Sequence, residues 1–290
     1  MNIEQVILSG LTSGAIYALI AIGFVIIYNV TGIVNFAQGE STMLGAMIVI
    51  SLVNAGINTF IAACLTIIIV VAIHILLYRV VLYPLRNVKN ILITVMVTMG
   101  AGTVMAGIAL LIWGTDARSL DPFTKGEPIS FFRASITTQD FWIIGTCAAI
   151  IMFIFYLFDK TYFGMSIRAC MSNQKASKLM GIPIDRMAMF AFALSAGVGA
   201  LGGIVMAPNT FAEYDMGMML GLKGFVAAIL GGLTGAPAAI VGGFTLGLIE
   251  SFGAGFISSG YKDFIAFGAL IVIMIVRPSG ILGKHTQKKV

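Results

Sequence analysis

Charged residues are scarce in this sequence. Asp, Glu, Lys and Arg make up only 10% of its 290 residues, whereas 59% are hydrophobic and the mean hydropathy is +1.02. Soluble domains carry about a quarter charged residues, so this composition excludes a protein that folds with water as its main solvent. It predicts an integral membrane protein in contact with lipid, and we expect no nucleic-acid partner.

Cysteine is also rare. Cys64, Cys147 and Cys170 are scattered without a Cys-x-x-Cys pair, so the sequence suggests neither a disulfide framework nor a metal site, and we interpret all three as packing residues. The Gly-x-x-x-x-Gly-Lys-Ser/Thr loop that cradles nucleotide phosphates is missing as well. Its nearest approach, residues 280–285, has the wrong spacing and no hydroxyl after the lysine. We therefore expect no cofactor and no catalytic residue in this chain.

Long runs without Asp, Glu, Lys or Arg fill most of the chain. A membrane-spanning helix requires about 20 apolar residues, and turn sequences at residues 54–58 and 235–237 divide the longest apolar stretches. We expect the first run to be a retained span, because no basic residue precedes it. The sequence predicts an all-α fold, a single transmembrane domain over residues 1–290 built as a polytopic helical bundle with eight or nine spans, some short or broken. The uncharged runs are residues 6–28, 41–78, 90–115, 141–158, 187–212 and 224–249.

Basic residues gather in three places. Short loops rich in Lys and Arg stay on the cytoplasmic side of a membrane, so all three clusters are expected there. The segments 114–140 and 209–222 carry balanced or acidic charge and are expected outside. The basic clusters are Arg79, Arg86 and Lys89; Lys160, Arg168, Lys175, Lys178 and Arg186; and Arg277, Lys284, Lys288 and Lys289.

Glycine is abundant, with 34 residues. Helices in lipid associate through small residues that let their backbones approach, often at a spacing of four. The spacing occurs four times here, and together the pairs predict a tightly packed bundle rather than a specific dimer motif. The pairs are Gly10/Gly14, Gly199/Gly203, Gly231/Gly235 and Gly243/Gly247.

A polar stretch, residues 29–41, separates two apolar runs. Polar groups near membrane depth are costly and usually face a cavity or a partner. We therefore hypothesise that this stretch lines or gates a central translocation pathway, with Gly32 and Gly39 permitting a broken or bent helix. The alternative is an ordinary cytoplasmic turn capped by Asn and Glu. The candidate pathway residues are Asn35, Phe36, Gln38, Gly39 and Glu40.

Few charges interrupt the apolar runs. A buried Glu250 would fit a proton-coupled transporter, but we interpret it as an interfacial residue at a helix end. Lys262 and Asp263 adjoin a predicted helix boundary and are expected to reach toward the lipid headgroups. His74 is interpreted as structural. We find no internal duplication of the kind typical of many secondary transporters.

The loop at residues 159–187 is expected to be cytoplasmic. Residues 166–180 predict one short helix outside the bilayer, with Gly181 as a stop and Pro183 beyond it. Ala169, Ala176 and Met180 would form a small apolar face between basic residues, suited to a groove on a cytosolic partner. A basic amphipathic helix that rests on anionic lipid is the alternative.

The same loop resembles the coupling loop of a known family, the permease subunits of branched-chain amino-acid ABC importers of the Liv type. The resemblance extends over nearly the whole chain, through residues 10–23, 32–46 and 230–237, and is closer to the Liv-H-like than to the Liv-M-like subunit. It implies that the loop couples the permease to an ATPase. The coupling residues would be Gly164, Arg168, Ala169, Asn173, Ala176, Leu179, Met180, Gly181 and Ile182.

The resemblance also implies partners. These would be a second permease subunit in a heterodimer, two cytoplasmic ATPase subunits that bind the ATP, and an extracytoplasmic binding protein that delivers leucine, isoleucine or valine. The location would be the bacterial inner membrane. A sister ABC permease for urea or short amides remains an alternative, as do a secondary transporter or channel and a membrane scaffold that transports nothing.

Overall fold

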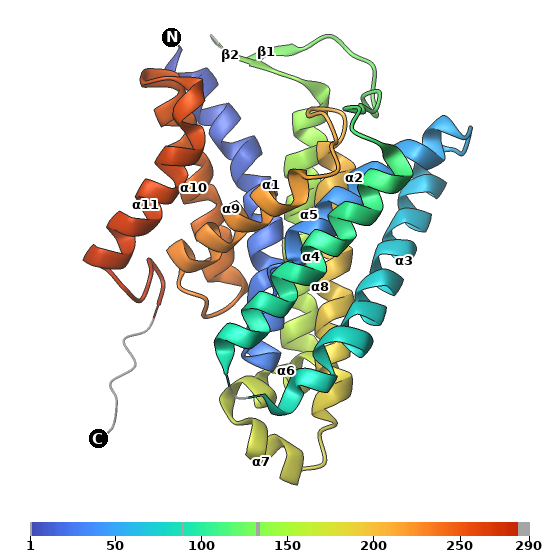
Figure 1. Cartoon of the computed structure of the whole chain (residues 1–290). Helices are drawn as coiled ribbons and strands as arrows, with labels where there is room; N and C mark the ends of the chain where they lie inside the picture. The colour runs from blue at the N-terminus through green and yellow to red at the C-terminus, as the bar shows by residue number, and fades with distance from the viewer. Residues whose placement is uncertain (1, 89, 132–133, 284–290) are drawn as a thin grey trace.

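The computed structural model describes residues 2–88, 90–131 and 134–283 and is a bundle of α-helices (Figure 1). Helices account for 77% of the structure. The strands form one antiparallel hairpin, β1 (Ile129–Phe131) with β2 (Ala134–Ile136), in which Ile129 lies opposite Ile136. The predicted class, a helical membrane bundle, is confirmed. The helices are α1 (Ile3–Thr31), α2 (Gln38–Asn54), α3 (Thr59–Leu77), α4 (Ile91–Trp113), α5 (Thr138–Lys160), α6 (Tyr162–Ser172), α7 (Gln174–Leu179), α8 (Ile184–Met206), α9 (Met216–Gly231), α10 (Ala236–Phe256) and α11 (Lys262–Val276).

Seven of the described helices are long and apolar enough to cross a membrane. They are α1, α4, α5, α8, α10, α3 with its π-helical extension Tyr78–Leu82, and α11 with the 3-10 turn Ser259–Tyr261 before it. Besides α6 and α7, two described helices are shorter, α2 with 17 residues and α9 with 16. The predicted eight or nine crossings include these two, and both begin next to the candidate pathway.

Helix α1 lies at the centre and is the most buried of the seven long helices. It packs mainly on α10 and α8. Gly10 and Gly14 meet Gly243 and Gly247 of α10, and a Cβ atom on Gly14 would lie 2.9 Å from the Cα of Phe244. Only glycine permits backbones to lie this close. Two of the glycine pairs therefore form one interface, as the prediction of tight packing requires.

The two ends of the bundle differ in charge. Helices α6 and α7 and the turn after α3 lie at one end, and the N-terminus and the β hairpin lie at the other (Figure 1). The first end, which we call the basic end, carries Arg79 and the cluster from Lys160 to Arg186. Other residues on which the orientation was predicted, Lys89, Lys284, Lys288 and Lys289, lie outside the described residues.

Candidate translocation site and coupling segment

The chain between α1 and α2 leaves the helical conformation inside the bundle. Helix α1 ends at Thr31, where Gly32 adopts φ 71° and donates its N–H to the carbonyl of Tyr28. Residues 33–37 are not helical, yet Asn35 and Ala37 are fully buried. Non-helical backbone at membrane depth is tolerated only where protein or a cavity satisfies its polar groups. Nearly all of residues 35–40 are buried, so this turn is not a solvent-exposed loop.

Gln38 joins the start of α2 to the middle of α8. Ser195 Oγ donates to Gln38 Oε1 at 2.6 Å, and Gln38 Nε2 donates to the Ser195 carbonyl at 3.1 Å. The amide occupies space left by two glycines, because a Cβ atom on Gly23 or Gly199 would collide with Gln38 or its neighbour Ser41. Gln38 therefore joins α2 to α8 by hydrogen bonds and packs against α1 at Gly23.

One face of α9 follows the candidate pathway residues. Gly217, Gly221 and Phe225 are spaced four residues apart, so they line a single stripe on the helix. Glu40 lies against Gly217, and a Cβ atom on Gly39 would lie 2.6 Å from the Cα of Gly221. We call these three residues the α9 stripe. Sequence reasoning missed it, although the four-residue spacing was visible.

Three aromatic rings pack together beside the contact between α2 and α9. The Phe36 and Phe225 ring centroids are 5.0 Å apart, and Phe24 of α1 lies 6.3 Å from Phe36 and 5.8 Å from Phe225. Phe36 also donates its backbone N–H to Thr98 Oγ1 of α4 at 3.3 Å. The predicted residues Asn35 to Glu40 are thus enclosed by α1, α4, α8 and α9.

Polar atoms without partners remain in this enclosure. Of the six side-chain atoms in the described residues that are buried without a hydrogen-bond partner, Asn35 Nδ2 and Glu40 Oε2 lie in this segment. An unpaired buried polar group costs about 1–3 kcal/mol, more if it is charged. Groups of this kind are expected where a polar substrate passes. The segment therefore combines unpaired polar atoms with the ring of Phe36.

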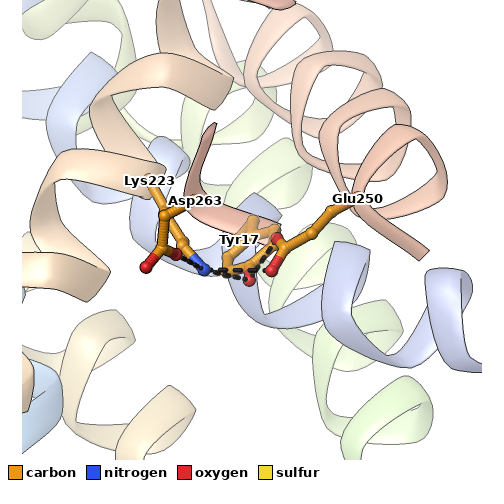
Figure 2. A network of polar contacts seen from close by, with 4 residues as sticks. All are labelled: Tyr17, Lys223, Glu250 and Asp263. Atoms are coloured by element: carbon orange, nitrogen blue, oxygen red, sulfur yellow. Dashed lines mark hydrogen bonds and ion pairs between the residues drawn. The ribbon is translucent and has the colours of Figure 1, made fainter. Parts of the chain in front are cut away.

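A second polar cluster lies on another face of α9 (Figure 2). Lys223 Nζ contacts Glu250 Oε1 at 3.0 Å and Asp263 Oδ1 at 2.8 Å, and Tyr17 donates its hydroxyl to Glu250 Oε2 at 2.6 Å. We call these four residues the clamp, because they join α1, α9, α10 and α11.

Two predictions are corrected by the clamp. Glu250 is not an interfacial residue at a helix end, since it lies within α10 and is only 4% exposed. Asp263 does not extend toward headgroups but turns inward to Lys223. Sequence reasoning missed Lys223 altogether, although a lone lysine between apolar runs was a signal that it required a buried partner.

The loop predicted as one helix over residues 166–180 contains two. Helix α6 ends at Ser172 and α7 begins at Gln174, because Asn173 is extended and its side chain accepts the N–H of Ala176 at 3.1 Å. Asn173 is therefore an N-cap rather than a mid-helix residue. Ala169 and Ala176 lie on different helices, so the predicted shared apolar face is wrong.

We call the part of the loop from Gly164 to Ile182 the coupling segment. The coupling residues predicted in it divide into a buried set and an exposed set. Gly164 lets α6 pack against the end of α5 at Leu157 and Phe158. Burial raises the pKa of the Cys170 thiol, with a smaller opposing effect from a hydrogen bond with Ser177, so this cysteine stays neutral. Gly181, at φ 83°, ends the segment, and Ile182 beyond it is partly buried. The exposed set is Arg168, which pairs with Asp159 at 3.0 Å, and Asn173, Ala176, Leu179 and Met180.

One hydrogen bond connects the coupling segment to α1. The last carbonyls of a helix have no partner within that helix. Here the carbonyl of Val30, in the last turn of α1, accepts a hydrogen bond from Gln174 Nε2 of α7 at 2.8 Å. Gln174 was not among the predicted coupling residues. The segment is therefore joined to α1, which precedes Gln38 in the chain. It is also joined to α8, which follows the segment directly and carries Ser195.

Comparison with known proteins identifies relatives over almost the entire chain. Residues 6–274 match the family model described as branched-chain amino acid transport system / permease component. The high-affinity branched-chain amino acid transport system permease protein LivH of Salmonella typhimurium is 34% identical over 99% of this chain and 97% of its own length. The corresponding protein BraD of Pseudomonas aeruginosa is 31% identical, with the same coverage.

A solved structure has a similar fold. The structure of PsaBC from Streptococcus pneumoniae in complex with Fab superimposes with a TM-score of 0.51, covering 93% of this chain and 91% of that chain. Sequence identity is 14%, so this likeness concerns the fold alone.

Proposed function

The chain belongs to the family of permease components of branched-chain amino-acid transport systems, and from this premise we propose how its segments and partners carry out import. It is a multi-pass membrane protein, the permease of an ABC importer for branched-chain amino acids. In the proposal it lies in the bacterial inner membrane, in a heterodimer with a second permease. Two cytoplasmic ATPases bind the ATP, an extracytoplasmic binding protein delivers leucine, isoleucine or valine, and this chain carries no cofactor.

The coupling segment carries the proposal. Leu179 is 89% exposed and Met180 is 83% exposed at the tip of α7, next to the exposed Ala176. An apolar tip at the basic end, surrounded by Lys175 and Lys178, suits a groove on a partner protein. We assign the ATPases to this tip, with membrane lipid around the outward faces of the helices.

Motion then has two routes into the bundle. When ATP closes the ATPases, they displace α7; Gln174 pulls on the Val30 carbonyl at the end of α1, while α8 moves as a continuation of the segment. Both routes reach the contact between Gln38 and Ser195. Alternating access results when this contact and the α9 stripe change their positions around the pathway.

Substitutions on α7 test docking and transmission separately. We expect Ala176→Trp to prevent co-purification of the ATPases and to abolish ATP-driven leucine uptake in proteoliposomes, because the indole would obstruct the groove. Gln174→Met keeps the side-chain length but removes the donor. We expect it to retain the ATPases while the leucine moved per ATP hydrolysed decreases several-fold, and Gln174→Lys, which can still donate, to preserve most of it. Unchanged coupling in Gln174→Met would contradict the role of this hydrogen bond.

The clamp argues against a proton-coupled alternative. Both oxygens of Glu250 already have partners, Lys223 and Tyr17. A carboxylate that carries protons has to lose and regain such partners in each cycle. We therefore assign Glu250 the task of holding helices together.

A further inference from the structure

We infer that the enclosure between residues 35–40 and the α9 stripe is a binding site for the zwitterion of an α-amino acid. Glu40 would hold the ammonium group, Asn35 the carboxylate, and the rings of Phe24, Phe36 and Phe225 the apolar side chain. This inference rests on the proposed function and names the groups that recognise its substrate.

Glu40 provides the first argument. Its side chain is 2% exposed, Oε2 has no hydrogen-bond partner, and within the described part of the chain no ion pair reaches it. A buried carboxylate without a cation is strongly unfavourable. Lys223, the buried cation of α9, is already held by Glu250 and Asp263. A substrate ammonium supplies both the missing positive charge and the missing N–H donors.

Asn35 provides a complementary group. Its Oδ1 accepts the backbone N–H of Ala37 at 3.2 Å, which fixes the orientation of the amide. Nδ2 then faces away from that bond, fully buried and without an acceptor in the described structure. An amide N–H donor in this position suits a carboxylate. The two unpaired groups therefore have opposite requirements, and the two charged ends of an amino acid satisfy both.

Gly102 of α4 lies next to Glu40 and next to the backbone of Ala37. A Cβ atom on Gly102 of α4 would lie 3.6 Å from Glu40 Oε1 and 3.7 Å from the Cα of Ala37, the residue that anchors Asn35. Gly102 therefore leaves the space next to Glu40 without a side chain. Phe36, between the two polar residues in sequence, directs its ring to Phe24 and Phe225, as a site for a short branched apolar side chain requires.

The structure shows this site closed. The backbone of Gly39 rests directly on Gly217 and Gly221, and the carboxyl group of Glu40 lies against Gly217. A substrate enters only when the α9 stripe separates from the start of α2, which exposes Glu40 and Phe36 together. The contact between glycines is therefore the gate of the site.

Binding to the intact importer complex in nanodiscs, without binding protein, tests the inference. The probes are radiolabelled leucine, with 3-methylbutylamine as a competitor that lacks the carboxylate and 4-methylpentanoate as one that lacks the ammonium group. We expect Glu40→Gln to weaken leucine and the amine by about tenfold or more and to leave 4-methylpentanoate unchanged. Asn35→Leu should show the converse pattern, weakening leucine and 4-methylpentanoate only. Glu213→Gln, the same change at an exposed site, is the control.

The outcomes separate the inference from the function. If the wild-type complex drives leucine uptake with ATP but Glu40→Gln binds all three probes as the wild type does, the site is wrong and the importer assignment stands. Absence of leucine binding by a wild-type complex that transports it also overturns the site. Absence of ATP-driven uptake by the wild type overturns the function itself. If Glu40→Gln does not assemble, Glu40→Asp should assemble and bind leucine with intermediate affinity; wild-type affinity in that variant contradicts the inference.

Discussion

Buried polar groups lack partners on one face of α9 and are paired on the other. On one face the α9 stripe lies against Glu40, whose Oε2 lacks a hydrogen-bond partner in the described structure. On the other face Lys223 has three acceptors for its three N–H donors. Lys223 comes two residues after Gly221, the middle residue of the stripe. At about 100° per residue its side chain lies about 200° further around the helix, on nearly the opposite face. One short helix thus separates a fully paired polar cluster from a region that contains unpaired polar atoms.

The difference shows how a moving helix can be positioned. A fully paired polar network is rigid and specifies a single arrangement of the elements that it joins. The clamp ties α9 to α1, α10 and α11, so the stripe moves with that group of helices as a unit. The opposite face is held mainly by glycine backbone contacts and ring packing, which separate without breaking an ion pair.

The clamp gives the largest expected effect. Lys223→Met leaves Glu250 buried without its cation, and we expect it to lower the free energy of unfolding by about 3–5 kcal/mol. The double variant Lys223→Met with Glu250→Gln removes both charges and keeps an acceptor for Tyr17. It should recover most of that loss in thermal unfolding in detergent. Equal losses of unfolding free energy in the single and double variants would show that the pairing of Lys223 with Glu250 does not account for the stability that the clamp provides.

A substitution at the gate is expected to have the second largest effect. Gly39→Ala places a methyl group against the backbone of α9, so we expect a loss of about 1–3 kcal/mol from overpacking and a strong decrease in uptake. Gly100→Ala on α4 is the matched control, because no atom lies within 4 Å of the added Cβ. It should be neutral, or stabilising by up to about 1 kcal/mol. If both alanines behave alike, the close contact between α2 and α9 does not form in the membrane.

Asp263 gives the smallest effect. Its side chain is 53% exposed, so its ion pair with Lys223 is screened by solvent. We expect Asp263→Asn to cost less than about 1 kcal/mol and to leave uptake near the wild-type level. A loss as large as that of Lys223→Met would mean that α11, rather than Glu250, provides the main partner of the lysine.

Part of the site could be read from local sequence. Gly32, Asn35, Gln38 and Glu40 form a polar interruption between apolar runs, and that pattern alone indicated a break in the helix at membrane depth. A helical loop outside the bilayer was predicted in the same way, from basic residues and a Gly181 stop, whereas its coupling role was implied by the family resemblance. The break at Asn173 was missed because the residues around it favour a helix, and only the cap on Ala176 ends α6 there.

Other features could not be read from the sequence. In the sequence Phe24 and Phe225 look like any lipid-facing aromatic residues, and only the folded structure packs them against each other and against Phe36. In the sequence Gln174 looks like a surface residue, and only the folded structure places the end of α1 beside it. Nothing in their neighbourhoods along the chain distinguishes these residues from packing or surface positions.

The sequence by itself determined the solvent, the helical class and the position of the broken segment, because these depend on the composition of short windows. Only the tertiary structure decided which polar groups are paired. Tyr17 and Lys223 are 206 residues apart in sequence, and Tyr17 and Glu250 are 233 apart. The energy of a buried charge depends on its neighbours in space, so the residues of the clamp are paired and Glu40 Oε2 is left without a partner for reasons that no local stretch of sequence contains.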